Sequence, residues 1–285
     1  MKIATTIGML NPRHFTEVAQ AADQLGYESL WMPEHLVFPV SMSGSPFAAG
    51  DDDAHPPVPP ETPLYDAFAY LSFLAAKTSR IRLGTNVYLL GLRHPFVAAR
   101  AVQTLDIVSG GRAEVGVGAG WLRSEWQAAG LDPRTRGRRL DESLAVCKRL
   151  WSEDSVAHSG EFYRFDAVKF EPKPLQQPHP PLHIGGESDA ALARVARYGD
   201  GWFGVGHDLQ SIEPVLQRLQ GALRAQGRAL ADIEVITAAR VNSPDELQRW
   251  ADLGVTRLVV TPWERGRDAV AALERFAQMA GLAPA

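Results

Sequence analysis

Strand-like and helix-like segments alternate along the whole chain, and this alternation restricts the fold more than any other feature. Short apolar segments typical of buried strands occur at residues 3–8, 29–33, 81–86, 113–118, 182–185, 201–205, 233–237 and 257–261. Each is followed by a segment whose apolar residues recur at helical spacing. Repeated strand–helix units imply a parallel sheet with crossover helices. Eight units that close on themselves form a (β/α)8 TIM barrel of about 250 residues.

The length of the chain agrees with one such barrel. Its 285 residues would allow two average domains, but barrels of this size form a single one. An open, doubly wound sheet is the alternative, and it usually has a phosphate-binding loop directly after the first strand. Residues 8–12 (Gly-Met-Leu-Asn-Pro) have no such pattern. We therefore predict a single α/β barrel domain over residues 1–285.

Two segments interrupt the alternation and are predicted insertions. Residues 36–64, after the second strand, are rich in Pro, Gly, Ser and Asp and include three consecutive aspartates at 51–53. This loop belongs to the end of the barrel where active sites lie, so we expect a mobile lid. Residues 155–181, before the fifth strand, alternate aromatic and polar residues after Ser159-Gly160-Glu161, which predicts a small hairpin packed on the barrel.

Composition excludes several classes of function. The net charge is −4 and no basic stripe is present, so nucleic acid is not an expected partner. The single cysteine, Cys147, lies on the apolar face of a predicted helix and is expected to be buried. No disulfide or cysteine-based metal site is possible within one chain. With no signal peptide and no membrane-length apolar run, we expect a cytoplasmic protein that does not contact the membrane.

The residues at the predicted strand ends limit the chemistry, because barrel active sites form there. None of these ends has a lysine, which argues against Schiff-base catalysis. None has a His-x-His pair, which argues against a metal hydrolase, and we predict no metal site. Glycines, aromatic residues and one titratable pair remain. This set suits a flat cofactor that brings its own reactivity.

The titratable pair is Glu34 and His35, directly after the second strand. A histidine titrates near neutral pH and can exchange a proton with a substrate. His35 is therefore the main catalytic candidate, with Glu34 beside it. A purely structural role, in which His35 only holds the following loop, is the alternative.

Two glycine-containing segments are candidate cofactor contacts. Gly185, Gly186 and Ser188 open a predicted helix, where Ser188 can cap the helix and free backbone N–H groups attract a phosphate. Gly118 lies in a Gly-x-Gly-x-Gly run that lacks the spacing of a dinucleotide-binding motif. Close packing of the backbone beneath a cofactor ring explains that run equally well.

Taken in order, several motifs resemble the luciferase-like monooxygenase superfamily, and especially its probable F420-dependent oxidoreductases. They occupy residues 30–35, 79–85, 105–112, 116–121, 181–186 and 199–202. The resemblance implies a barrel with an insertion, commonly a homodimer. It also implies either reduced FMN with oxygen, or F420 with hydride transfer.

Carried over by position, the resemblance places His35 near the reactive edge of the cofactor ring, with Glu34 beside it. Asn86 and Val87 match a bulge beneath the ring, often with a non-prolyl cis peptide. Gly185, Gly186 and Ser188 match the phosphate end. The loop 36–64 matches no pattern with a known substrate.

We therefore predict an F420-dependent oxidoreductase that acts on a small organic molecule. An FMN-dependent two-component monooxygenase of the same fold is the first alternative, and a non-catalytic flavin-binding barrel is the second. The acidic tail of F420 would favour exposed arginines near the phosphate end. The sequence offers four candidates: Arg93, Arg123, Arg134 and Arg136.

Overall fold

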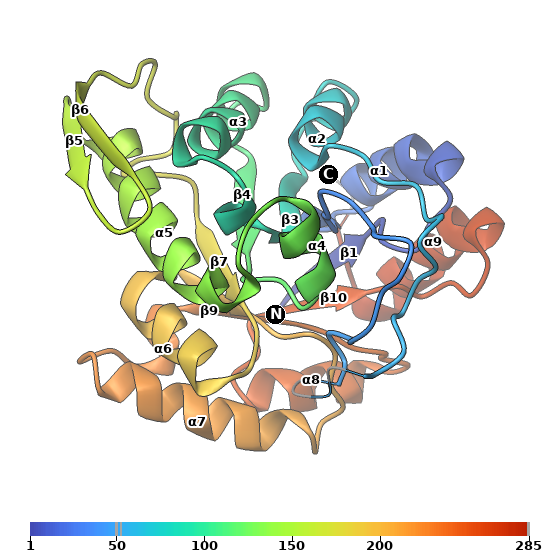
Figure 1. Ribbon diagram of the computed structural model, residues 1–285. Helices are drawn as coiled ribbons and strands as arrows, with labels where there is room; N and C mark the ends of the chain where they lie inside the picture. The colour runs from blue at the N-terminus through green and yellow to red at the C-terminus, as the bar shows by residue number, and fades with distance from the viewer. Residues whose placement is uncertain (49–50, 52, 284–285) are drawn as a thin grey trace.

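The computed structural model describes residues 1–48, 51 and 53–283 and confirms the predicted barrel. Eight parallel strands close in the order β1-β10-β9-β8-β7-β4-β3-β2 (Figure 1). The strands are β1 (Lys2–Thr6), β2 (Ser29–Met32), β3 (Arg82–Tyr88), β4 (Ala113–Val117), β7 (Leu182–Gly185), β8 (Gly201–Phe203), β9 (Glu234–Ala238) and β10 (Arg257–Val260).

A helix follows each barrel strand, as the sequence pattern predicts, and these helices surround the barrel (Figure 1). They are α1 (Phe15–Gln24), α2 (Ala67–Ala75), α3 (Pro95–Val108), α5 (Arg136–Ser152), α6 (Asp189–Tyr198), α7 (Ile212–Arg224), α8 (Pro244–Asp252) and α9 (Ala269–Ala280). Most buried apolar side chains lie between the strands and this ring of helices. No helix in the described ranges is long and apolar enough to cross a membrane.

A smaller apolar cluster around Trp31 includes Ala4, Phe203, Ile236 and Val259, all from barrel strands. The indole ring contacts Phe203 edge-on at a centroid distance of 4.9 Å. A Cβ atom at Gly84 would come within 2.3 Å of the Trp31 ring, so that position has no room for a side chain. The barrel interior is thus packed with side chains, and ligands have access only at its ends.

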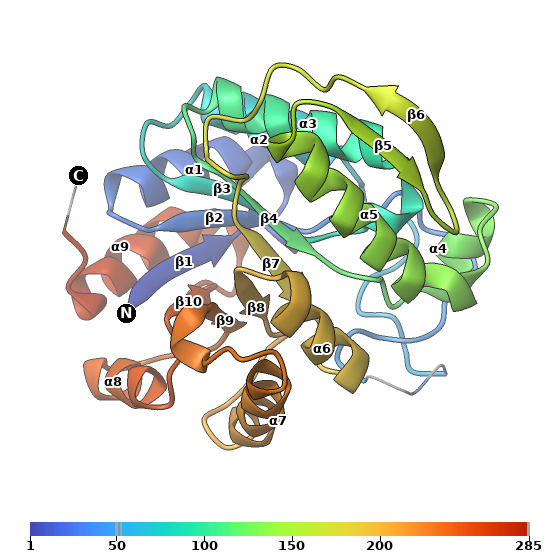
Figure 2. The same ribbon diagram turned by 90° about the vertical axis from the view of Figure 1, so that its left-hand side faces the viewer.

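The predicted hairpin is present as β5 (Val156–Ser159) and β6 (Arg164–Val168), and it lies beside α5 (Figure 2). Its turn is fixed by Glu142 of α5, which accepts hydrogen bonds from the amides of Phe162 and Tyr163 at 3.0 and 2.9 Å. Cys147 is fully buried, as predicted. Burial raises the pKa of its thiol well above the usual range.

Two further segments lie beyond the carboxyl ends of the strands (Figure 2). One is α4 (Arg123–Ala128), a short helix that the sequence pattern does not predict. The other is the loop of residues 36–64, whose residues 49, 50 and 52, including one of the three aspartates, lie outside the described residues. Its proposed role as a mobile lid stays a prediction.

Candidate active site

The predicted site residues lie at one end of the barrel, where the strands have their carboxyl ends. Glu34 and His35 follow β2, Asn86 and Val87 lie near the end of β3, and Gly118 directly follows β4. Gly185 ends β7, and Gly186 and Ser188 connect it to α6. The carboxyl end of a parallel barrel is where catalytic groups are normally found.

His35 is held by a carboxylate from α4. Its Nδ1 lies 2.8 Å from Oε2 of Glu125, and the two side chains are 15% and 0% exposed. Aromatic rings flank the imidazole, with centroid distances of 4.7 Å to Phe38 and 5.6 Å to Trp121. His35 is thus partly accessible and fixed in orientation, as a group that exchanges protons with a ligand must be.

Glu34 forms a buried ion pair with Arg93. Its Oε2 also accepts a hydrogen bond from the amide of Leu89 at 2.9 Å. Burial raises the pKa of Glu34, and the Arg93 guanidinium opposes that increase. Both oxygens are thus engaged within the protein, so this carboxylate supports the chain segment after β3 and is not a free acid or base.

The same ion pair corrects one expectation about the cofactor tail. Arg93 was a candidate for an exposed tail-binding arginine, but its side chain is only 13% exposed. Its guanidinium binds Glu34 and lies 4.5 Å from the ring centroid of Tyr88. Arg93 is therefore not available to an acidic ligand tail.

A bulge near the end of β3 lies at this end of the barrel. The register between β3 and β4 shifts between Thr85 and Tyr88, and the Asn86–Val87 peptide bond is cis, as the resemblance implied. In the bulge, Oδ1 of Asn86 is buried and has no hydrogen-bond partner among the described residues. A buried polar atom without a partner is costly, so Asn86 is a natural contact for a ligand with a hydrogen-bond donor.

The glycines next to the bulge make room for it. A Cβ atom at Gly116 would lie 2.0 Å from the carbonyl oxygen of Thr85. At Gly118 and Gly185 it would come within 2.5 and 2.8 Å of the methyl groups of Val87. Packing against the bulge therefore accounts for Gly118 without any contact to a ligand, and its predicted contact with the cofactor stays a prediction.

We expect Gly118→Ala to destabilise the protein by about 1–3 kcal/mol, because the new methyl group overlaps Val87. The double variant Gly118→Ala/Val87→Ala removes that overlap, so its destabilisation should be smaller than the sum of the two single effects. Urea unfolding measures all three variants. Gly221→Ala in α7 is the control, since a Cβ there meets no atom within 4 Å. Additive effects of the two site substitutions would contradict the packing argument.

The start of α6 has the features predicted for an anion site. Ser188 is the N-cap, and its Oγ accepts a hydrogen bond from the amide of Ala191 at 3.2 Å. Gly186 has a φ of +108°, which favours glycine. Arg218 from α7 binds the carbonyl oxygen of Glu187 at 2.8 Å and the carboxylate of Asp189. Its guanidinium therefore lies next to the free N–H groups at the start of the helix, where phosphates commonly bind.

Comparison with known proteins identifies the family. The sequence pattern of the luciferase-like monooxygenase family matches residues 3–260. The chain belongs to this family. An uncharacterised protein of Mycobacterium tuberculosis (strain ATCC 25618 / H37Rv) is 36% identical over 262 residues, which are 91% of each chain.

Two characterised relatives of this luciferase-like protein use different cofactors. The F420-dependent glucose-6-phosphate dehydrogenase of Kineococcus radiotolerans is 31% identical over 86% of this chain and 70% of its own length. The FMNH2-dependent dimethylsulfone monooxygenase of Pseudomonas putida is 34% identical over 55% of this chain and 44% of its own. The family is thus one of oxidoreductases and monooxygenases with deazaflavin- and flavin-dependent members.

Solved structures have the same fold as this luciferase-like chain. Monooxygenase RslO1 from Streptomyces bottropensis has a TM-score of 0.79 at 21% identity, with 98% of both chains covered. An F420-dependent secondary alcohol dehydrogenase, in complex with an F420–acetone adduct, has a TM-score of 0.76 at 16% identity, covering 98% and 97%. At these identities the likeness establishes the barrel alone.

Sequence reasoning missed Glu125 and Arg218 in this luciferase-like barrel. Glu125 lies in α4 and Arg218 in the middle of α7, so neither belongs to a strand end. The only sequence signal for Glu125 is its position shortly after the glycine- and tryptophan-containing segment that follows β4. Arg218 gives no signal, because a basic residue on an amphipathic helix is typical of a solvated face.

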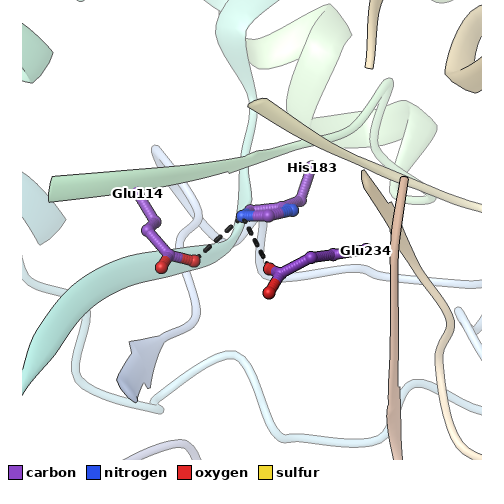
Figure 3. Close-up of side chains that lie close together, drawn as sticks. All are labelled: Glu114, His183 and Glu234. Atoms are coloured by element: carbon purple, nitrogen blue, oxygen red, sulfur yellow. Dashed lines mark hydrogen bonds and ion pairs between the residues drawn. The ribbon is translucent and has the colours of Figure 1, made fainter. Parts of the chain in front are cut away.

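A second polar cluster lies at the opposite end of the luciferase-like barrel. Glu114, His183 and Glu234 come from β4, β7 and β9 and point toward one another (Figure 3). Nε2 of His183 is 2.9 Å from Glu114 and 4.0 Å from Glu234. Their ligand atoms are close enough to hold a metal ion.

Counter-ions already surround these two carboxylates. Arg257 reaches both, with N–O distances of 2.7 Å to Glu114 and 2.6 Å to Glu234. Arg82 also pairs with Glu114, and Lys2 lies 2.7 Å from Glu234. Three permanent cations thus balance the carboxylates and would repel a metal ion, so we interpret the cluster as a structural ion network.

Proposed function

We propose that this chain is an F420-dependent oxidoreductase that transfers a hydride to or from a small organic substrate. The main support is the placement of His35, a fixed and partly accessible imidazole at the carboxyl end of the barrel, in a family of redox enzymes. The F420-dependent relative matches 86% of the chain, compared with 55% for the FMNH2-dependent one. That difference favours the deazaflavin.

The residues around the bulge fit a flat cofactor. In the proposal, Asn86 and Val87 lie beneath the ring, and Oδ1 of Asn86 gains the hydrogen bond that none of the described residues provides. Gly185, Gly186 and Ser188 hold the phosphate end at the start of α6. F420 supplies the carbon centre that accepts or gives the hydride. His35 exchanges a proton with the substrate.

Exposed arginines near that phosphate end can bind an acidic cofactor tail. Arg218 is next to the start of α6 and its side chain is 46% exposed. Arg134 is 89% exposed just before α5, which packs beside α6. Both already pair with an aspartate at the surface, and such exposed pairs are weak enough to exchange partners.

Parallel titrations of the purified apoprotein with F420 and with FMN test the proposal. We expect F420 to bind at least about tenfold more tightly, a difference of about 1.4 kcal/mol. Fluorescence of the two cofactors gives both dissociation constants. Tighter binding of FMN, with turnover that requires oxygen and reduced FMN, would instead establish the monooxygenase. Binding of either cofactor without turnover of any substrate would favour the non-catalytic barrel.

A second candidate function has one specific observation in its favour. RslO1, a monooxygenase, has the same fold over 98% of both chains. Because that likeness is one of fold alone, we keep the FMN-dependent monooxygenase as the alternative.

A further inference from the structure

Glu125 is a buried carboxylate at the active-site end of the barrel, and it is not among the residues proposed to bind the cofactor. Its side chain is fully buried. One oxygen, Oε1, accepts hydrogen bonds from the amides of Leu36 and Val37 at 2.6 and 3.3 Å. The other, Oε2, lies 2.8 Å from Nδ1 of His35. A single carboxylate thus binds the histidine and the first residues of the 36–64 loop.

This arrangement determines which ring nitrogen of His35 holds the proton. An ionised carboxylate can only accept hydrogen bonds, so Nδ1 must be the donor. In the neutral imidazole the other nitrogen is then an acceptor. Within the described part of the chain, Nε2 has no hydrogen-bond partner. Nε2 is therefore the ring atom left to take a proton from a bound molecule.

We propose that Glu125 is a positioning residue that keeps His35 in the Nδ1–H tautomer, with Nε2 as the proton acceptor. Because the same carboxylate binds Leu36 and Val37, it also fixes the imidazole relative to the first residues of the 36–64 loop. The inference rests on the proposed catalytic role of His35. The tautomer itself can be measured without any cofactor.

Glu125→Gln tests the idea because glutamine has nearly the same shape but only one accepting oxygen. Two fixed backbone N–H groups compete for that oxygen, so the side-chain oxygen should face Leu36 and Val37. The NH2 group then faces His35 and can only donate, which requires Nδ1 to accept. The neutral ring should therefore switch to the Nε2–H tautomer.

The chain contains a matched control in Glu142. This residue also accepts from a histidine, His158, at 2.9 Å, and from two consecutive backbone amides, those of Phe162 and Tyr163. Glu142 lies in α5, and its partners belong to the hairpin, which lies on the outer side of α5 and apart from α4 (Figure 1). Glu142→Gln removes the same kinds of hydrogen bond, so it should reproduce any general loss of stability without changing turnover.

The first measurement uses the ring ¹⁵N chemical shifts of histidine in the apoprotein, above the usual titration range of the imidazole. The His35 signals are assigned by their loss in His35→Gln. We expect the Nδ1–H tautomer in the unmodified protein and the Nε2–H tautomer in Glu125→Gln. Glu125→Asp keeps an acceptor-only side chain, so it should retain Nδ1–H. A glutamine variant that keeps Nδ1–H, or an aspartate variant that switches, would overturn the inference.

The second measurement is turnover with bound cofactor. Glu125→Gln should lower kcat by about 10²–10⁴-fold, the usual contribution of a general acid or base. The dissociation constant of the cofactor should change by less than about threefold, since the Glu125 carboxylate hydrogen-bonds His35, Leu36 and Val37 and not the residues proposed to bind the cofactor. Glu125→Asp should recover part of the lost kcat. An equal loss of kcat in Glu142→Gln would overturn the positioning role.

The two measurements separate this inference from the proposed function. If neither F420 nor FMN binds but the tautomer switches, the proposed function fails while the control of His35 by Glu125 stands. If F420 binds and turns over but the tautomer is unchanged, the proposed function stands and the inference fails.

Discussion

His35→Ala should lower turnover by about 10²–10⁴-fold, the range expected when a general acid or base is removed. The imidazole is fixed by Glu125 and partly accessible at the carboxyl end of the barrel, where a hydride and a proton must both move in the proposed reaction. Cofactor binding should weaken by only about 1–2 kcal/mol, the value of one lost hydrogen bond. The bulge at Asn86 and Val87 and the start of α6 are left intact.

Steady-state kinetics and cofactor titration of the same preparation check this prediction, with turnover expressed per folded molecule. His158→Ala is the control, because His158 also binds a glutamate, Glu142, but belongs to the peripheral hairpin. The structural alternative is that His35 only anchors the loop that follows it. Its loss would then lower the melting temperature and leave turnover per folded molecule unchanged, and the catalytic assignment would be wrong.

The order of the strands and helices could be predicted because it depends on local patterns. Short apolar segments between helical patterns locate the strands. Chains with eight strand–helix units of this kind generally close into a barrel. The position of the predicted site residues has the same origin: His35 follows a strand, and Val87 and Gly185 lie at or near strand ends, so topology alone brings them to one end of the barrel. Their roles stay predictions. Element ends were less accurate, as in α5, which begins at Arg136 and not at Leu140.

Glu125 shows what local patterns cannot supply. Its helix has six residues, too few to display a helical period, and its N-cap, Leu122, provides no side-chain hydrogen bond. Glu125 and His35 are 90 residues apart in the chain. Whether they meet depends on the path of the segment between β4 and α5. Only the folded structure shows that contact. The ion pair between Glu34 and Arg93 is likewise visible only in the folded structure, and it engages a carboxylate that the sequence alone presents as unpaired.

The ion network at the other end of the barrel was also missed, because its members are single charges within apolar strands. Glu114 and His183 each occupy the second position of a strand, and Arg257 the first. In the closed barrel the side chains of Glu114 and His183 point toward each other (Figure 3), and Arg257 lies 2.7 Å from Glu114. In the sequence each of these charged residues stands alone within its strand. Closure of the barrel brings opposite charges together, so that they neutralise one another.

Glu114→Gln should destabilise the protein by about 3–5 kcal/mol at pH 7, the usual cost of removing one partner from a buried ion pair. The carboxylate is 1% exposed and binds three groups: Arg82, His183 and Arg257. Its loss removes the carboxylate bound to Nη1 of Arg257, whose side chain is itself 1% exposed, and leaves that guanidinium with Glu234 at 2.6 Å and Glu28 at 3.9 Å. Urea unfolding at pH 7 measures the difference in free energy.

Exposed charge pairs supply the control for that measurement. Arg149 and Glu153 form an i,i+4 pair on α5 with side chains 39% and 44% exposed. Glu153→Gln should therefore change the free energy of unfolding by only about 0.3–0.5 kcal/mol. Similar effects of the two substitutions would show that the barrel network contributes no more than a surface pair.

The pH dependence gives an independent check, and its sign follows from Glu114. Burial alone would raise the pKa of this carboxyl group. The hydrogen bond from His183 and the charges of Arg257 and Arg82 outweigh that effect and hold the pKa well below its usual range. A group whose pKa is lowered on folding stabilises the protein above its unfolded pKa, near 4.5 for glutamate, and that stabilisation is lost as pH falls toward the folded value.

The stability difference between the unmodified protein and Glu114→Gln should therefore be constant above about pH 5.5 and shrink steadily in more acidic solution. A difference that grew on acidification would mean that protonating Glu114 strengthens the fold, which is incompatible with its place among three cationic or hydrogen-donating partners.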